Sequence, residues 1–324
     1  MIVKPVPIAW HPGLSVFASE PFLQAVGDNY GWLGGFDEFD NLQCVLPYTM
    51  ITKSIFRMVR FRVETIHIGQ GIDVDAEKAF LNGVTAHFKS MGADIIIPAT
   101  TNTIFRTFPD GAIAAPYGSY VIDLNQTEEL LWQNIDRITR QNIKSAQKNS
   151  VTVQRRIEPL DEAYRLIVET FRRSKLPFMG YEAFRRYADG LTGQMEIMIA
   201  SCQGVAQSYV LFAFSNYCAY AVYAGNIADM CQGANKLLYW EAIRYFKKIG
   251  VQKYDFVGAR INPEKGTKQS GINSLKKRFG AKLVQGYMWK YKIRPVKSLA
   301  YSIAVRLLRG GDIVDAECHK IESI

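Results

Sequence analysis

The second half of the sequence alternates strand-like and helix-like segments in the order typical of α/β folds. Residues 195–225 contain three runs rich in apolar side chains, separated by the short turns "SCQG" and "SNY". Residues 234–249 follow with apolar side chains at helical spacing, and Gly250 ends that segment. The run "YDFVGA" then returns to a strand pattern. This order predicts a mixed sheet flanked by helices.

The first part of the chain shows the same kind of alternation. Residues 42–51 and 93–100 are predicted as strands, and the helix predicted at 75–92 lies between them in sequence. The chain is therefore predicted to be α/β (α+β), with one domain at 1–125 and another at 151–324. A basic amphipathic helix predicted at 126–150 connects them, with Asn125 or Thr127 as its cap.

The composition narrows the class of protein. Of the 324 residues 48% are hydrophobic, which is enough for packed cores. The sequence has no run of about 18 apolar residues, so we predict no transmembrane helix. The first residues do not resemble a signal peptide. The cysteines are odd in number and scattered, so we expect buried thiols, no metal site and a cytoplasmic protein. They are Cys44, Cys202, Cys218, Cys231 and Cys318.

The positive charge is concentrated near the end of the chain. The formal net charge is +9, yet residues 260–309 alone contain thirteen Lys and Arg residues and a single acid, Glu264. Such clustering indicates an anionic partner, either phosphate, nucleic acid or the inner face of a membrane. A solvated basic surface is the alternative.

Three ordered segments resemble one family, the Fem-type peptidyltransferases. Residues 120–153 combine a strand ending in Asp-Leu with a helix rich in Arg and Lys. Residues 233–259 contain Asn-x-Leu-Leu, Glu-Ala-Ile and Tyr-Asp-Phe-x-Gly. Residues 271–281, "GINSLKKRFGA", are similar to the family's Gly-(x)3-Phe-Lys-x-x-Phe-Gly segment. The resemblance covers about residues 119–285, whereas residues 1–118 match in general layout.

The resemblance implies two tandem domains with the acetyltransferase (GNAT-like) fold. It also implies transfer of an amino acid from aminoacyl-tRNA to an amine on a peptidoglycan or surface-polysaccharide precursor, with no further cofactor. Lys276 matches the family's Phe-Lys lysine, near the reacting carbonyl, and Lys277 and Arg278 would hold phosphates. Leu275 stands where the family usually has Phe, and the long coiled-coil arm of some members has no counterpart here.

Two residues are candidates for the chemical step. Aminoacyl transfer to an amine passes through a tetrahedral oxyanion, which the cation of Lys276 could stabilise by about 3 kcal/mol. The attacking amine must lose a proton, and Asp255 at the end of a predicted strand could accept it. The alternatives are a phosphate or surface contact for Lys276 and a structural hydrogen-bond acceptor for Asp255.

Further residues are candidates for substrate binding. Tyr223 lies at the end of a predicted strand and either binds substrate or packs. Asn235 begins a predicted helix, where capping is the alternative role. Arg260 and Lys268 lie on a predicted loop, where they either bind phosphate or are solvated. The predicted substrate-binding set is Tyr223, Asn235, Arg260, Lys268, Lys277 and Arg278.

Residues 295–309 form a second basic feature. The apolar residues Val296, Leu299, Ile303 and Leu307 share one face of a predicted helix, with Lys and Arg around it. This pattern is typical of a terminal helix docked on a core. The alternative is an interfacial helix on anionic lipid, which would suit a lipid-linked acceptor and a peripheral position at the inner face of the membrane.

Two other functions compete with the Fem-like hypothesis. An acyl-CoA N-acyltransferase of the same fold usually has a Gln/Arg-x-x-Gly-x-Gly/Ala loop opening a helix, which grips the CoA pyrophosphate. The comparable stretch here, "MCQGANKLL", matches poorly, with Met230 at its first position and Asn235 at its last. A non-catalytic RNA or membrane-binding module would explain the charge, but we find no RRM or KH signature.

Overall fold

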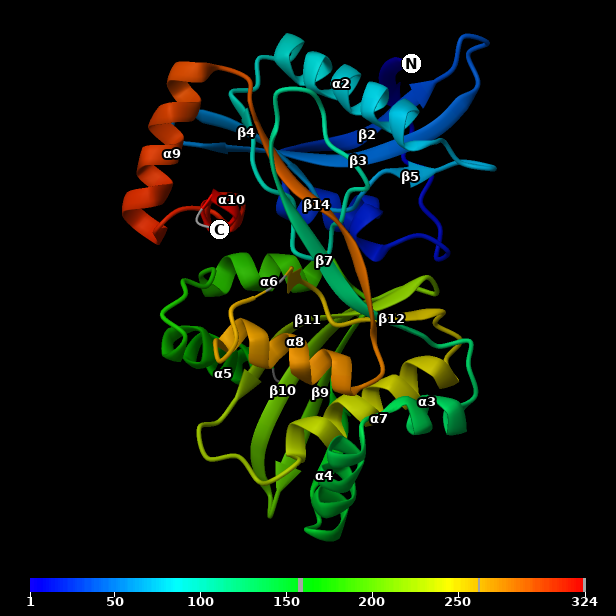
Figure 1. Cartoon of the computed structure of the whole chain (residues 1–324), viewed down its shortest axis with the longest axis vertical. Coiled ribbons are helices and arrows are strands. Elements are labelled where there is room, and N and C mark those ends of the chain that lie inside the picture. Colours follow the sequence, from blue (N-terminus) through cyan, green and yellow to red (C-terminus); the bar gives the residue numbers. More distant parts are fainter. Residues whose placement is uncertain (157–159, 262, 323–324) are drawn as a thin grey trace. The chain divides into compact units, whose positions relative to one another are not determined.

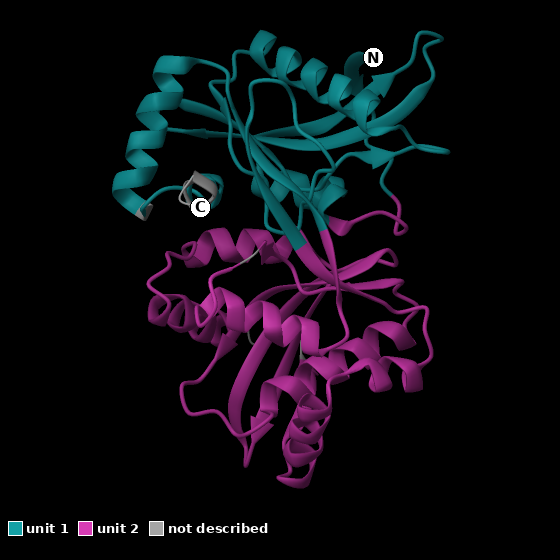
Figure 2. Ribbon diagram, in the orientation of Figure 1, with its two compact units in different colours: residues 1–10, 17–118, 285–324 teal, residues 11–16, 119–284 magenta. Residues whose placement is uncertain are grey.

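The computed structural model describes residues 1–156, 160–261 and 263–322, and it divides into two compact units (Figure 2). Unit 1 comprises residues 1–10, 17–118 and 285–324, and unit 2 comprises residues 11–16 and 119–284. These limits differ from the predicted segments, because residues 285–324 group with unit 1. Both units are mixed α/β, which confirms the predicted fold class.

Unit 1 is a mixed sheet with helices packed around a core of aromatic rings. In the core, the Trp289 ring lies 5.4 Å from that of Phe61 and 5.3 Å from that of Phe105, which explains why the C-terminal segment belongs to this unit. The strand order is β1-β2-β3-β4-β6-β14, and β5 pairs with β3. The strands are β1 (Ile2–Val6), β2 (Asn29–Phe36), β3 (Leu42–Lys53), β4 (Phe56–Phe61), β5 (Ile66–His67), β6 (Ile95–Ile96) and β14 (Lys282–Lys292).

The longest helix of unit 1 forms where the sequence predicts it. The Asp73 side chain accepts a hydrogen bond from the Ala76 N–H and so caps the helix, and Gly92 follows its end with φ of 74°. The helices of this unit are α1 (Glu20–Val26), α2 (Val74–Ser90), α9 (Pro295–Arg309) and α10 (Ile313–Glu322), and the 3-10 helix η1 (Val16–Ala18) spans the boundary of the unit (Figure 1).

Unit 2 is a second mixed sheet, with strand order β7-β12-β11-β10-β9-β8, in which only the described pair β11 and β12 is parallel. Strands β7 and β14 have residues in both units. The short β13 pairs with β7. The strands are β7 (Ile113–Asp123), β8 (Thr152–Arg156), β9 (Met195–Cys202), β10 (Val205–Phe214), β11 (Cys218–Asn226), β12 (Lys253–Asp255) and β13 (Ala259–Arg260).

Helices cover both faces of this sheet. Phe212 of β10 packs 5.2 Å from the ring of Phe246 in α7, whereas the Tyr209 hydroxyl of the same strand donates to Glu162 in α5. Because side chains alternate along a strand, α7 and α5 lie on opposite faces. The helices are α3 (Glu128–Asn134), α4 (Arg137–Lys148), α5 (Leu160–Arg173), α6 (Tyr181–Asp189), α7 (Ala234–Lys248) and α8 (Lys268–Arg278) (Figure 1).

The single connecting helix predicted at 126–150 is wrong, because two helices occupy this segment. Thr127 caps α3, as predicted, by accepting from the Leu130 N–H. Ile135 then adopts an extended backbone, and the Asp136 side chain accepts from the Thr139 N–H to begin α4. A capping aspartate between two helical runs therefore ends one helix and starts the next.

The cysteines differ from the expected set of free thiols. Cys202 at the end of β9 and Cys231 before α7 form a disulfide, so the expectation is wrong for these two. Cys44 and Cys218 are buried thiols, as expected, and Cys318 is half-buried. Among the described helices, none has the length and apolar character needed to cross a membrane.

Candidate active site

The sheet of unit 2 opens where its two parallel strands part. Strands β11 and β12 pair only from Cys218–Tyr220 to Lys253–Asp255, after which β11 continues to Asn226 while β12 ends. Ligands of open α/β sheets bind beyond the carboxyl ends of such strands. Asp255 is the last residue of β12, so the structure places this predicted residue at the opening.

The Asp255 carboxyl is buried and surrounded by donors. Asp255 is only 6% exposed, and its carboxylate accepts hydrogen bonds from the Ser119 hydroxyl of β7 and, at 2.7 Å, from the Val257 N–H. Burial raises the pKa of Asp255 above its ordinary value, while the two hydrogen bonds and the nearby charge of Lys276 act in the opposite direction. A carboxylate with raised proton affinity is a stronger base.

The backbone after β12 turns sharply through two left-handed residues. Val257 has φ of 52° and Gly258 has φ of 72°. Glycine adopts this conformation readily, but a β-branched residue in it is an outlier that costs free energy. The turn directs the Val257 N–H to Asp255. Strain of this kind concentrates at functional sites, which supports a functional reading of this turn.

Lys276 of α8 reaches the same turn from the other side. The residue is 7% exposed, and its Nζ donates to the carbonyl of Val257 at 2.7 Å and to that of Gly258. Burial lowers the pKa of Lys276 to about 8, although the charge of Asp255 raises it in part. An ammonium group has three N–H donors, so one more can point to a ligand. The alternative of a surface contact for Lys276 is wrong.

The three adjacent basic residues at the end of α8 differ in their exposure. Lys276 is buried, whereas Lys277 and Arg278 in the same last turn of α8 are exposed. The Arg278 carbonyl accepts a hydrogen bond from the Asp136 N–H at 2.8 Å, which joins the end of α8 to the start of α4. The fold thus holds the exposed cations in a fixed place.

The start of α7 is a second positive feature, and the sequence indicated only part of it. Gly233, with φ of 80°, is the N-cap, so Asn235 lies inside the first turn and its alternative role as a helix cap is wrong. This turn contains no acid. Lys236 is half-buried there, and its pKa is lowered by burial and by the charge of Arg278. The positive end of the helix dipole, Lys236 and Arg278 together favour a bound anion.

The other predicted residues have different surroundings, and among them the Arg260 carbonyl accepts a hydrogen bond from Asn273 of α8 at 2.9 Å. Tyr223 of β11 is packed among aromatic rings, with that of Phe178 at 5.0 Å. Arg260 and Lys268 do not lie on a loop as predicted: Arg260 belongs to β13 and Lys268 is the first residue of α8. Lys268 and Arg278 occupy opposite ends of α8, roughly 15 Å apart at 1.5 Å per residue.

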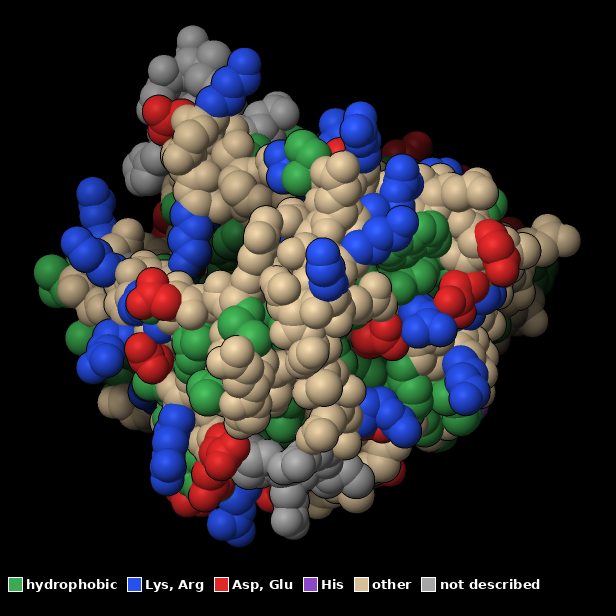
Figure 3. Space-filling model, turned by 90° about the horizontal axis from the view of Figure 1, so that it is seen from below, with side chains coloured by type: hydrophobic (Ala, Val, Ile, Leu, Met, Phe, Trp, Pro, Cys, Tyr) green, Lys and Arg blue, Asp and Glu red, His purple; other side chains and the backbone are tan. Residues whose placement is uncertain are grey.

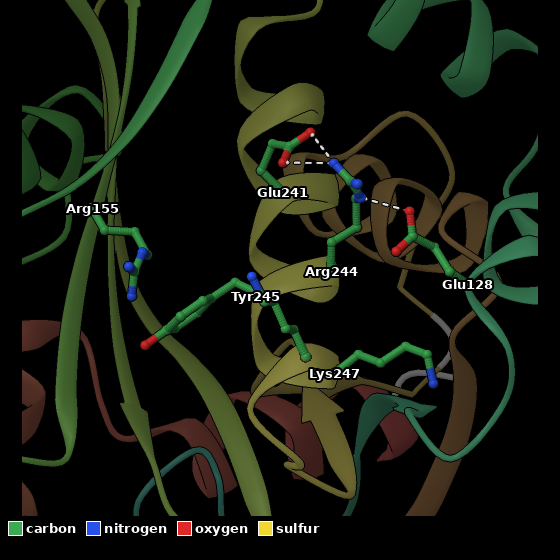
Figure 4. A pocket seen from close by; sticks show the side chains of 7 residues that line it. Glu128, Arg155, Glu241, Arg244, Tyr245 and Lys247 are labelled. Carbon is green, nitrogen blue, oxygen red and sulfur yellow. Dashed lines mark hydrogen bonds and ion pairs between the residues drawn. The ribbon is translucent and has the colours of Figure 1, made fainter.

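A surface pocket of about 570 Å³ in unit 2 contains none of the predicted residues. Arg244 lies in it between the carboxylates of Glu128 and Glu241, and Arg155 stacks 4.0 Å from the ring centroid of Tyr245 (Figure 4). These cations already have partners. An anion would have to compete with two carboxylates for Arg244, so this pocket is a poorer phosphate site than the start of α7.

The surface charge of the described residues is mixed rather than uniform. On the face seen in Figure 3, Lys and Arg side chains are scattered and interleaved with Asp and Glu. Net charge alone therefore does not locate a binding site on this face. The local cluster at the start of α7 and the end of α8 is the better guide.

The lowered pKa of Lys276 predicts how stability depends on pH. Between pH 8 and 10.5 the unfolded chain binds the proton that the folded chain has lost, so stability rises with pH in this window. Relative to Lys276→Met, which lacks the proton, the free energy of unfolding of the wild type should rise by about 3 kcal/mol across it. Urea denaturation of both proteins on either side of the window measures this. If the difference in free energy of unfolding between the two proteins stays constant across this pH window, the burial of a charged lysine is contradicted.

A protein-family comparison gives the class of protein. Residues 134–266 match the family described as "Acetyltransferase (GNAT) domain". This segment contains Asp255 and the start of α7. This segment is therefore similar to an acetyltransferase domain, and the prediction that the chain is a transferase is confirmed. A search of curated proteins finds no match.

Solved structures extend the likeness over nearly the whole chain. The structure titled "Crystal structure of FemX" has a TM-score of 0.68 at 14% identity and covers 92% of this chain and 99% of that one. The C-terminal domain of a putative lysylphosphatidylglycerol synthetase from Agrobacterium fabrum gives 0.56 at 13%, covering 92% and 94%. A tandem GNAT protein from the clavulanic acid biosynthesis pathway gives 0.50 at 10%, covering 90% and 98%. The Fem-like fold and the tandem GNAT-like architecture are confirmed.

Proposed function

We propose that this protein is a Fem-like aminoacyltransferase. It moves an amino acid from aminoacyl-tRNA to an amine on a peptidoglycan or surface-polysaccharide precursor. The observation that carries the proposal is the buried pair of Asp255 and Lys276 at the parted strands, because it offers a base and a cation at one place. The likeness to FemX supports the same function, as does the likeness to proteins named for lysylphosphatidylglycerol synthesis.

The pair fits the chemistry of amide formation. The amine nitrogen attacks the ester carbonyl carbon of the aminoacyl group, and Asp255 accepts the proton that the nitrogen loses. The remaining N–H of Lys276 stabilises the negative charge on the carbonyl oxygen. The bond to the ribose oxygen then breaks, and that oxygen takes up the proton from Asp255 as the new amide is released, which restores the carboxylate.

The tRNA end would be held by the neighbouring cations. In this proposal the start of α7, with Asn235 and Lys236, and the end of α8, with Lys277 and Arg278, receive backbone phosphates. Tyr223, Arg260 and Lys268 are then further candidates for contacts to donor or acceptor. A cytoplasmic enzyme at the inner face of the membrane would suit a lipid-linked acceptor.

An acyl-CoA-dependent N-acyltransferase is the second candidate. The matched family model is that of an acetyltransferase, and the start of α7 would equally suit a pyrophosphate. The loop that opens α7 argues against it, because the stretch "MCQGANKLL" has Met230 and Asn235 at the first and last positions of the expected Gln/Arg-x-x-Gly-x-Gly/Ala pattern. A purely RNA-binding or membrane-binding role gives no reason for a buried Asp255–Lys276 pair.

Filter binding to tRNA tests the proposal. We expect the wild type to bind aminoacyl-tRNA, and we expect Lys236→Ala, Lys277→Ala or Arg278→Ala to weaken binding roughly tenfold. Each change should also reduce the slope of log affinity against log salt concentration by about the amount that one phosphate contact contributes. Lys248→Ala is the matched control, because Lys248 is an exposed cation at the other end of α7.

Acetyl-CoA added as a competitor separates the two candidates. Binding of tRNA that resists acetyl-CoA and falls in the three variants supports the aminoacyl-tRNA donor. Tight acetyl-CoA binding without tRNA binding would transfer the protein to the acyl-CoA class. If Lys248→Ala loses as much tRNA affinity as the three variants do, the positive charge of the protein attracts tRNA without a defined site.

A further inference from the structure

Helix α9 of unit 1 carries an apolar stripe that the described protein does not cover. Val296, Leu299, Ile303 and Leu307 are between 52% and 83% exposed. At 100° per residue these four side chains span about 80° of the helix surface. Single exposed apolar residues are common, but a stripe along about three turns of one helix is an interaction surface.

The helix docks through its opposite side. The buried residue Asp94 accepts hydrogen bonds at its carbonyl from the Arg294 N–H at 2.9 Å and from the Ser298 hydroxyl at 3.0 Å, and its carboxylate accepts from Lys297. The Tyr301 ring packs 5.6 Å from that of Phe56. Docking of the apolar face on the core, the first expectation for this helix, is therefore wrong.

The charged side chains of α9 itself are all basic. The sequence has no acid between Glu264 and Asp312, and the exposed Arg306 lies beside the stripe on the helix. Exposed Lys292 and Arg294 precede the helix. An amphipathic helix with one exposed apolar face and basic flanks is the arrangement that binds in the interface of anionic bilayers.

We propose that α9 lies flat on an anionic lipid surface, with its four stripe residues inserted among the acyl chains. Ile55 would extend the inserted surface, since it is 65% exposed and its carbonyl accepts from Lys297 at 3.0 Å. Arg306 would contact lipid phosphates. The inference stands on α9 alone and does not require the proposed aminoacyl transfer.

The charge pattern favours lipid over a second copy of the chain. In a two-fold symmetric dimer the same patch meets itself. Two α9 stripes packed together would bring basic residues of one helix near basic residues of the other, with no acid on either helix to neutralise them. Anionic headgroups neutralise these cations, and the acyl chains cover the stripe.

Vesicle sedimentation with the full chain tests the proposal. We expect the wild type to sediment with vesicles of phosphatidylcholine and phosphatidylglycerol in equal parts, and to stay in solution with phosphatidylcholine alone. The double variant Leu299→Ser, Ile303→Ser should bind at least about tenfold more weakly, because two inserted side chains are lost. Arg306→Ala should bind more weakly and with less dependence on salt. The control is Leu176→Ser, an exposed apolar residue of unit 2, which should bind as the wild type does.

Two results would overturn the proposal. One is equal lipid binding by the wild type and the double variant. The other is sedimentation velocity showing a wild-type dimer that the double variant converts to monomer, since a second copy would then cover the stripe. Because neither measurement contains tRNA or an acceptor, failure here is distinct from failure of the proposed transfer reaction.

Discussion

Replacing Lys276 by methionine should lower the rate of aminoacyl transfer by roughly 100-fold to 1000-fold, because the oxyanion loses its cation. Asp255→Asn should lower it by roughly 100-fold or more, since the amide cannot accept the proton of the amine. Both replacements keep the size of the side chain, and an amide oxygen can still accept from Ser119 and Val257. The measurement is the single-turnover rate at which labelled amino acid leaves aminoacyl-tRNA for a cell-wall precursor.

The neighbouring residue supplies the matched control. Lys277→Met removes a cation one position along α8, but Lys277 is exposed and does not enter the buried turn. It should weaken tRNA binding and leave the rate at saturating tRNA unchanged. Loss of binding in Lys276→Met with an unchanged rate would make the buried lysine structural, and the chemistry would then have to come from the substrates themselves.

The site residues that can be predicted from the sequence are those that lie in local sequence patterns. Asp255 ends a strand and Lys276 lies in a motif near the end of a helix, so both could be named, and the structure brings them to one turn. The strand and helix order likewise follows from apolar periodicity. Apolar periodicity also gives the members of the α9 stripe.

The remainder depends on tertiary packing. Ser119 donates to Asp255 across 136 residues of sequence, which no local pattern reports. The left-handed backbone at Val257 contradicts the preference of a β-branched residue. The pKa of Lys236 is lowered by burial and by the charge of Arg278, and both depend on the folded structure. Periodicity shows which residues of α9 share a face, but not whether that face points inward.

Gly233→Ala should be among the most destabilising single changes in unit 2. A Cβ there would lie 2.1 Å from the backbone oxygen of Asn142, and a backbone atom cannot move aside as a flexible side chain would. The residue also has φ of 80°, which disfavours alanine. Together these effects should cost more than about 3 kcal/mol, because α4 and α7 must separate.

Gly250→Ala isolates the conformational part of this cost. Gly250 follows the same helix with φ of 81°, but an added Cβ would meet nothing within 4 Å. This variant should lose only about 1 kcal/mol in the free energy of unfolding measured with urea. The difference between the two variants therefore reports the contact of α4 with the start of α7. Equal losses would show that this contact is loose.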